Sequence, residues 1–222
     1  MKKILLTFGD SFTYGDELTD RNSAWPIQLA DAMGYQAVNL GKPGNSNDSI
    51  VSQLVEYVAN PDLPNPDLVV IGWTSPARVQ FADEFGEYIV WPGRSSVLFT
   101  NELLYRSELI EYISKYHNSE YIFKTYINQV VLAQTFLTAH NIRYVMCDIL
   151  GKDYYASLHK HKFNHYYDTV IDTSVIAGWP SDGMAEWAYG CKKGSRGHFL
   201  EDGHKKVSNK IYEHIRNLGW LS

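Results

Sequence analysis

A serine near the start of the chain and two histidines near its end have the side chains that nucleophilic catalysis needs. Ser11 ends the segment Gly9-Asp10-Ser11, while His198 and His204 lie close to the C-terminus. Serine catalysis requires a hydroxyl, a base that takes its proton, and donors that bind the oxyanion. The sequence therefore predicts Ser11 as a nucleophile with a C-terminal histidine as its base. Serine, aspartate and glycine are also common turn residues, so by itself the segment fits an ordinary turn as well.

The elements around these residues are predicted to bring them together. Residues 4–8 form a short apolar run bounded by glycine, which indicates a buried strand. Open α/β sheets bind their ligands beyond the carboxyl ends of such strands. Further strands are predicted at residues 37–40, 67–72 and 143–149.

Helical patterns alternate with these strands. They are predicted from a cap at Ser23 to Gly34, from about residue 50 to 58, and over 101–115, 120–140 and 202–217. The alternation predicts a three-layer, doubly wound, mostly parallel α/β sheet of the flavodoxin-like kind, in one domain over residues 1–222. Residues 76–99 form an aromatic-rich excursion with a small strand at 88–91, interpreted as a lid or substrate wall. Residues 151–198 show little periodicity.

Composition excludes several classes of protein. The 222 residues carry a net charge of −5 with no basic stripe, so no nucleic-acid partner is expected. No run approaches the roughly 18 apolar residues of a membrane span. The apolar run after Lys2 and Lys3 is too short for a signal peptide, and the two cysteines are far apart. A cytoplasmic protein is therefore predicted.

Three motifs in order resemble the GDSL, or SGNH, hydrolase family. They are Gly9-Asp10-Ser11, the loop Asn39-Leu40-Gly41-Lys42-Pro43-Gly44, and His198-Phe199-Leu200-Glu201-Asp202-Gly203-His204. The resemblance implies the SGNH hydrolase fold, with Ser11 as the nucleophile and His198 as the base. It also implies that the backbone N–H groups of Ser11 and Gly44 bind the oxyanion, and that His204 is structural.

Two positions depart from the family pattern. Thr74 stands in place of the family's oxyanion-binding asparagine, and Ser195 in place of the aspartate three residues before the base. The Thr74 hydroxyl is expected to donate to the oxyanion, with Asn45 or Asn47 as substitutes. The orienting acid is expected either from elsewhere, such as Asp182, or not at all, which would leave a Ser-His dyad.

The spacing leaves an alternative register open. Glu201-Asp202-Gly203-His204 itself reads acid-x-x-His, with His204 as the base and Glu201 as its partner. We favour His198, because the family's glycine-histidine pair then falls on Gly203-His204.

Other clusters predict less. His159, His161 and His165 lack the spacing and carboxylate of a metal site, so no metal and no organic cofactor are expected. Arg78 either meets an anionic substrate group or is a paired surface residue.

The sequence thus predicts a serine hydrolase, and the resemblance to the GDSL/SGNH family implies that it cleaves short acyl esters, including acetyl groups on sugars, with a small-molecule or carbohydrate ester as its partner. The alternative is a non-catalytic SGNH-fold protein that binds a carbohydrate or a protein, which the two departures favour.

Overall fold

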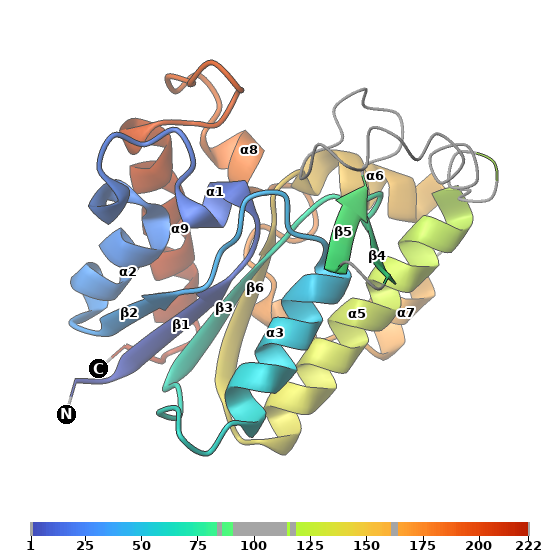
Figure 1. Cartoon of the computed structure of the whole chain (residues 1–222), viewed down its shortest axis with the longest axis horizontal. Helices are drawn as coiled ribbons and strands as arrows, with labels where there is room; N and C mark the ends of the chain where they lie inside the picture. The colour runs from blue at the N-terminus through green and yellow to red at the C-terminus, as the bar shows by residue number, and fades with distance from the viewer. Residues whose placement is uncertain (1, 84–85, 91–114, 116–118, 161–163, 222) are drawn as a thin grey trace.

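A parallel sheet forms the centre of the protein. The computed structural model describes residues 2–83, 86–90, 115, 119–160 and 164–221. Within these residues, four parallel strands lie in the order β2-β1-β3-β6 (Figure 1). Their bounds are β1 (Ile4–Phe8), β2 (Gln36–Asn39), β3 (Leu68–Trp73) and β6 (Arg143–Asp148). The predicted strands and the predicted α/β fold class are confirmed.

Helices cover both faces of this sheet. Side chains alternate along a strand, so Leu6 of β1 packs toward α3 and α5, whereas Leu5 packs toward α2 and α9. The same alternation divides β3, because Val69 and Ile71 lie on the first face while Leu68 and Val70 lie on the second. Every residue of β3 is buried, as expected for a strand covered on both sides.

The helices of the described residues agree with most of the sequence predictions. Their bounds are α1 (Ser11–Tyr14), α2 (Trp25–Met33), α3 (Asn47–Ala59), α5 (Ser119–Ala139), α6 (Gly151–Lys160), α7 (Asn164–Thr169), α8 (Met184–Trp187) and α9 (Glu201–Asn217), with 3₁₀ turns η1 (Arg21–Ser23) and η3 (Thr173–Val175). The predicted cap at Ser23 is wrong, because Ala24 precedes α2 without a side-chain cap. The predicted helix over 101–115 lies almost wholly outside the described residues.

The aromatic excursion begins with a hairpin. β4 (Val79–Asp83) pairs antiparallel with β5 (Gly86–Val90), which contains the predicted small strand up to its last residue. Residues 91–99 lie outside the described residues, so a lid or substrate wall stays a prediction. In the described parts of the chain, no helix has the length and apolar character that a bilayer crossing requires.

The carboxyl ends of the strands open on one edge of the sheet. In Figure 1, α1, α8 and the beginning of α9 lie at this edge, whereas both chain termini lie at the opposite end. α1 begins three residues after β1 ends, and α9, which contains His204, follows the loop that holds His198. The topology therefore brings the first strand and the last helix of the chain to the same place.

A buried carboxylate ends β6. Asp148 is 1% exposed and accepts hydrogen bonds from the Tyr126 hydroxyl and, at 2.9 Å, from the Tyr155 hydroxyl. Burial raises the pKa of this carboxyl to about 6, although the two hydrogen bonds act in the opposite direction. The folded protein therefore holds the Asp148 proton more tightly than the unfolded chain does.

This difference predicts a pH dependence of stability. The Asp148 contribution to the free energy of unfolding falls as pH rises from about 4 to about 6, and stays level above that. Asp148→Asn removes this titration. In urea unfolding between pH 4 and 8, the stability of the wild type minus that of the variant should fall by about 3 kcal/mol across this window. Other titrating groups cancel in the difference, so a difference that is independent of pH contradicts the prediction.

Candidate active site

Ser11 is the first residue of a short helical turn beyond β1. Asp10 caps α1, because its Oδ1 accepts the Phe12 N–H at 2.9 Å. Gly15 ends the turn in the left-handed conformation at φ 85°, and its N–H donates to the Ser11 carbonyl. The chain thus folds tightly around Ser11, which is 5% exposed.

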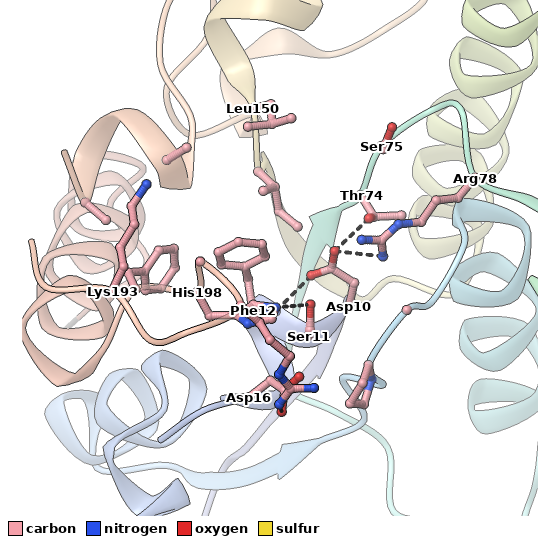
Figure 2. Close-up of a pocket in the computed structure, with 18 of the residues that line it drawn as sticks. Asp10, Ser11, Phe12, Asp16, Thr74, Ser75, Arg78, Leu150, Lys193 and His198 are labelled. Carbon is pink, nitrogen blue, oxygen red and sulfur yellow. Dashed lines mark hydrogen bonds and ion pairs between the residues drawn. The ribbon is translucent and has the colours of Figure 1, made fainter. Parts of the chain in front are cut away.

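His198 hydrogen-bonds to Ser11, although the two residues are 187 positions apart in the sequence. The Ser11 Oγ lies 2.8 Å from the His198 Nε2, which is hydrogen-bonding distance (Figure 2). The His198 side chain is 13% exposed, and the Phe12 ring lies 4.7 Å from its ring centre. The structure therefore brings the predicted nucleophile and the predicted base together in the geometry that serine catalysis uses.

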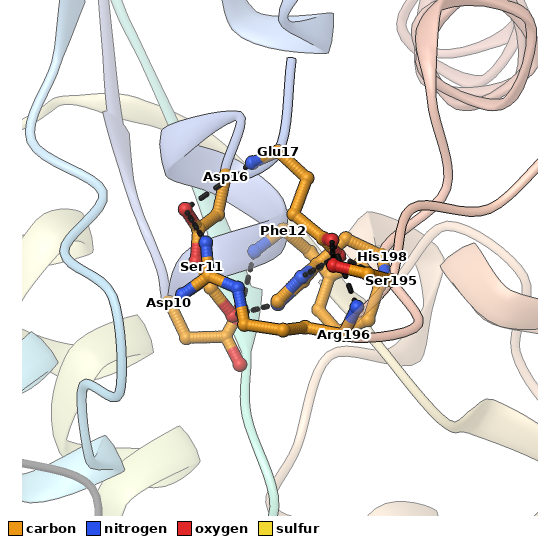
Figure 3. Close-up of polar contacts among 8 residues, drawn as sticks. All are labelled: Asp10, Ser11, Phe12, Asp16, Glu17, Ser195, Arg196 and His198. Carbon is orange, nitrogen blue, oxygen red and sulfur yellow. Dashed lines mark hydrogen bonds and ion pairs between the residues drawn. The ribbon is translucent and has the colours of Figure 1, made fainter.

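An acid that the sequence analysis did not consider lies behind His198. The Glu17 Oε2 is 2.8 Å from the His198 Nδ1 (Figure 3). Its other oxygen, Oε1, accepts the Ser195 hydroxyl at 3.0 Å and the Arg196 N–H at 2.8 Å. No motif identifies Glu17, and the only available signal is a carboxylate shortly after the nucleophile. Asp182, the acid proposed from sequence, is exposed and has no contact with His198 among the described residues.

The backbone and the charge of Glu17 are both unusual. Its φ is 66°, a left-handed conformation that non-glycine residues rarely adopt. Gly194 permits the close approach, since a Cβ there would lie 2.5 Å from the Glu17 carboxyl carbon. Burial acts to raise the pKa of Glu17, but hydrogen bonds from Arg196, His198 and Ser195 lower it to about 2. Glu17 is therefore a carboxylate at any physiological pH.

Thr74 hydrogen-bonds to the fold through both its hydroxyl and its backbone N–H. Its hydroxyl donates to the Asp10 Oδ2 at 2.7 Å, and its N–H donates to the Asn47 Oδ1 at 2.9 Å. The same Asp10 oxygen forms a buried ion pair with Arg78 at 3.0 Å. Because the one hydroxyl proton of Thr74 is used by Asp10, this geometry gives no support to Thr74 as an oxyanion donor.

The two asparagines named as substitutes also hydrogen-bond within the fold. The Asn45 amide donates to the Gly9 carbonyl at 3.2 Å, and the Asn47 amide to the Thr74 carbonyl at 3.1 Å. By contrast, no hydrogen bond from the backbone N–H of Ser11 or Gly44 is found among the described residues. Both residues line the same cavity, so these two N–H groups are the donors available to an oxyanion.

His204, the second candidate histidine, is a buried structural residue. His204 is fully buried, and its Nδ1 accepts the Trp25 N–H at 3.2 Å. Burial, together with the nearby charge of His198, lowers the pKa of His204 to about 4. Glu201 is exposed and has no contact with His204 among the described residues. This geometry gives no support to the alternative register, with His204 as base.

A cavity of about 680 Å³ lies over Ser11. The apolar part of its lining, here called the apolar wall, consists of Phe12, Ile149, Leu150, Ala185, Ala188 and Phe199. The lining also includes the Asp10–Arg78 pair, whose side chains lie close to Thr74 (Figure 2), and Arg196, which is bound to Asp16 at 2.8 Å. Arg78 is thus the paired residue that one reading of the sequence expected, but it is buried rather than on the surface.

The described residues contain no group of three or more histidine, cysteine or acidic side chains that could hold a metal ion. His161 and the side chain of His159 lie outside the described residues.

Comparisons with known proteins agree on the fold. A family model described as a family of unknown function, DUF6071, matches residues 16–221. No curated protein sequence matches. Among solved structures, a member of the lipolytic G-D-S-L family from Veillonella parvula covers 95% of this chain and 97% of its own, at 13% identity and a TM-score of 0.52.

Two esterase structures match this chain with similar sequence identities and TM-scores. The psychrotrophic esterase EstA from Pseudoalteromonas sp., in a structure inhibited by monoethylphosphonate, covers 97% of this chain and 98% of its own, at 13% identity and a TM-score of 0.55. A carbohydrate esterase family 2 enzyme from Corynascus thermopiles covers 99% and 68%, at 13% identity and a TM-score of 0.59. At such identities the likeness shows a shared fold, that of the GDSL-type esterases.

The Thr74 geometry predicts a variant that loses stability rather than catalysis. Thr74→Val removes one hydrogen bond to the buried Asp10 carboxylate, so the free energy of unfolding should fall by about 1–3 kcal/mol. We expect kcat for p-nitrophenyl acetate to fall by less than about tenfold, below the usual loss for an oxyanion donor. Denaturant unfolding and steady-state kinetics on the same preparation measure both. A loss of about 10²–10³ in kcat at unchanged stability would restore the oxyanion role.

Proposed function

The chain belongs to DUF6071, a family of unknown function, and we propose that it is a serine hydrolase of the GDSL/SGNH type that cleaves carboxylic esters. The observation that carries this proposal is the 2.8 Å contact between the Ser11 hydroxyl and the His198 imidazole, on the floor of a cavity. A serine within hydrogen-bonding reach of a base is the arrangement that activates a hydroxyl. The fold shared with GDSL-type esterases supports the same function.

The reaction proceeds in two halves. The Ser11 Oγ attacks the ester carbonyl while the His198 Nε2 takes its proton, and the N–H groups of Ser11 and Gly44 bind the oxyanion. The C–O bond to the alcohol then breaks, and His198 returns the proton to the leaving oxygen. In the second half, water gives a proton to His198 and attacks the acyl group on Ser11. Collapse of that intermediate releases the acid and returns the proton to Ser11.

The cavity favours small acyl esters as substrates. Its apolar wall suits the acyl part, while the polar side around Asp10 and Arg78 suits a leaving alcohol with hydroxyl groups. The carbohydrate esterase among the structural neighbours supports acetyl groups on sugars as one class. The chemistry needs no metal and no organic cofactor.

A fluorophosphonate probe tests the proposal directly. The phosphorus of such a probe reacts with an activated serine. The structural neighbour EstA is described as inhibited by monoethylphosphonate. We expect covalent labelling of Ser11, located by peptide mass spectrometry, and loss of p-nitrophenyl acetate hydrolysis in step with labelling. Absence of both labelling and hydrolysis in the folded protein would reject the esterase and favour the non-catalytic binder of a carbohydrate or protein.

A further inference from the structure

We propose that Glu17 is the positioning residue that orients His198, so that the orienting acid comes from the nucleophile's own loop. The inference rests on the proposed esterase function and assigns a role that no sequence motif gives. Glu17 lies six positions after Ser11, whereas the family pattern places its acid three residues before the base. The nucleophile and the acid then come from one segment, and the base from another.

The contacts of Glu17 determine the tautomer of His198. An ionised carboxylate only accepts hydrogen bonds, so the proton between Glu17 Oε2 and His198 Nδ1 must belong to the imidazole. The neutral ring carries one proton, which leaves Nε2 unprotonated and 2.8 Å from the Ser11 hydroxyl. Glu17 therefore keeps His198 in the only neutral tautomer that can accept the Ser11 proton.

The other contacts keep this carboxylate fixed and charged. Oε2 also accepts the backbone N–H of His198 at 3.1 Å, and Oε1 accepts the Ser195 hydroxyl and the backbone N–H of Arg196. The neighbouring Asp16 forms an ion pair with Arg196, so two consecutive acids hold the loop that carries the base (Figure 3). Glu17 also has a rarely populated backbone conformation. Such conformations persist only where the surrounding structure enforces them, and they are common at functional sites.

Ser195 explains the departure from the family pattern. It stands where the family has its aspartate, and its hydroxyl lies 3.0 Å from the Glu17 Oε1. Position 195 therefore still contributes to the site, because Ser195 donates a hydrogen bond to the acid, whereas the family residue at this position is the acid itself. During the reaction Glu17 stays ionised and stabilises the imidazolium of His198, while the proton moves only between Ser11, His198 and the leaving oxygen.

Glu17→Gln is the first test. The amide keeps the size of the side chain, but its NH₂ can donate to the His198 Nδ1, which favours the tautomer with the proton on Nε2 that cannot accept from Ser11. We expect kcat for p-nitrophenyl acetate to fall by about 10²–10⁴ while KM stays within about threefold, since the acid acts on the base and not on the substrate. A folded variant with a wild-type kcat overturns the proposal.

Glu17→Ala with Ser195→Asp separates positioning from packing. A carboxylate at position 195 enters the space that Glu17 leaves, because the Ser195 Oγ is already 3.0 Å from its oxygen. We expect the double variant to be at least about tenfold faster than Glu17→Ala alone, since an acid again faces His198. A structural role alone predicts no such recovery. A folded double variant that is no faster than Glu17→Ala also overturns the proposal, even where Glu17→Gln itself fails to fold.

Glu201→Gln is the matched control. It removes an exposed carboxylate just after the same loop, and we expect its kcat within about twofold of the wild type, because exposed charges act weakly at a distance. The Ser11 measurements distinguish the two ideas. If Ser11→Ala keeps full activity, the esterase proposal itself fails. If Ser11→Ala is inactive while Glu17→Gln is not, only the role of Glu17 is wrong.

Discussion

Ser11→Ala is expected to lower kcat for p-nitrophenyl acetate by about 10⁴–10⁶, because the variant has no nucleophile and retains only the binding and oxyanion contributions. The only side-chain contact of the Ser11 hydroxyl among the described residues is with His198, so its loss leaves the packing intact. Stopped and steady-state assays of ester hydrolysis, together with thermal unfolding, measure the two effects.

The control is Ser52→Ala, at an exposed position of α3 away from the cavity. It should match the wild type in both measurements. Retention of wild-type turnover by Ser11→Ala contradicts the assignment of the nucleophile. The Ser11→Ala, His198→Ala double variant should be no slower than either single variant, because residues that act as one unit have non-additive effects.

His198→Ala and His204→Ala are expected to fail in different ways. His198→Ala should lose kcat to a similar extent as Ser11→Ala, because no other base contacts the hydroxyl in the described residues. His204→Ala removes the acceptor of the Trp25 N–H and leaves a cavity beside Phe199. It should therefore lose about 2–4 kcal/mol of unfolding free energy while the folded fraction keeps its turnover.

Both histidine variants are compared by urea unfolding and by kcat per folded molecule. His204 adds a check on pH: its folded pKa of about 4 lies below that of an unfolded histidine, so its contribution to stability falls as pH drops from about 6.5 to about 4. This contribution should be absent in His204→Ala. A stable, inactive His204→Ala beside an active His198→Ala would contradict the assignment of the base.

The sheet and its helices were predictable because their signals are local. β3 is an unbroken apolar run, and α9 repeats Val207, Ile211 and Ile215 on one face, so each element is visible within its own sequence window. The prediction of a cap at Ser23 was wrong because Ser23 is the last residue of the 3₁₀ turn η1, which precedes α2. The helices between residues 151 and 187 are short, and their contacts rather than their periodicity determine them.

The site was predictable only in part, for the same reason. Ser11 and His198 were found through motifs of fixed spacing. Glu17 reaches His198 across 181 positions of sequence, through a left-handed backbone and a glycine on the opposite loop, and no local pattern records that pairing. Thr74 shows the converse: its position matched the motif, but its hydroxyl was taken by a carboxylate from another strand end.

The placement of the site has a consequence for the synthesis of the protein. β1 lies between β2 and β3, and it is followed by Ser11 and Glu17. Their partner His198 comes much later in the chain, just before α9. A ribosome must therefore synthesise the chain from Ser11 through His198 before the proposed centre can form, so a nascent chain that ends before His198 should carry none of the proposed activity. In the same way, any partial unfolding that separates the His198 loop from α1 should abolish the proposed activity, even where the sheet itself stays folded.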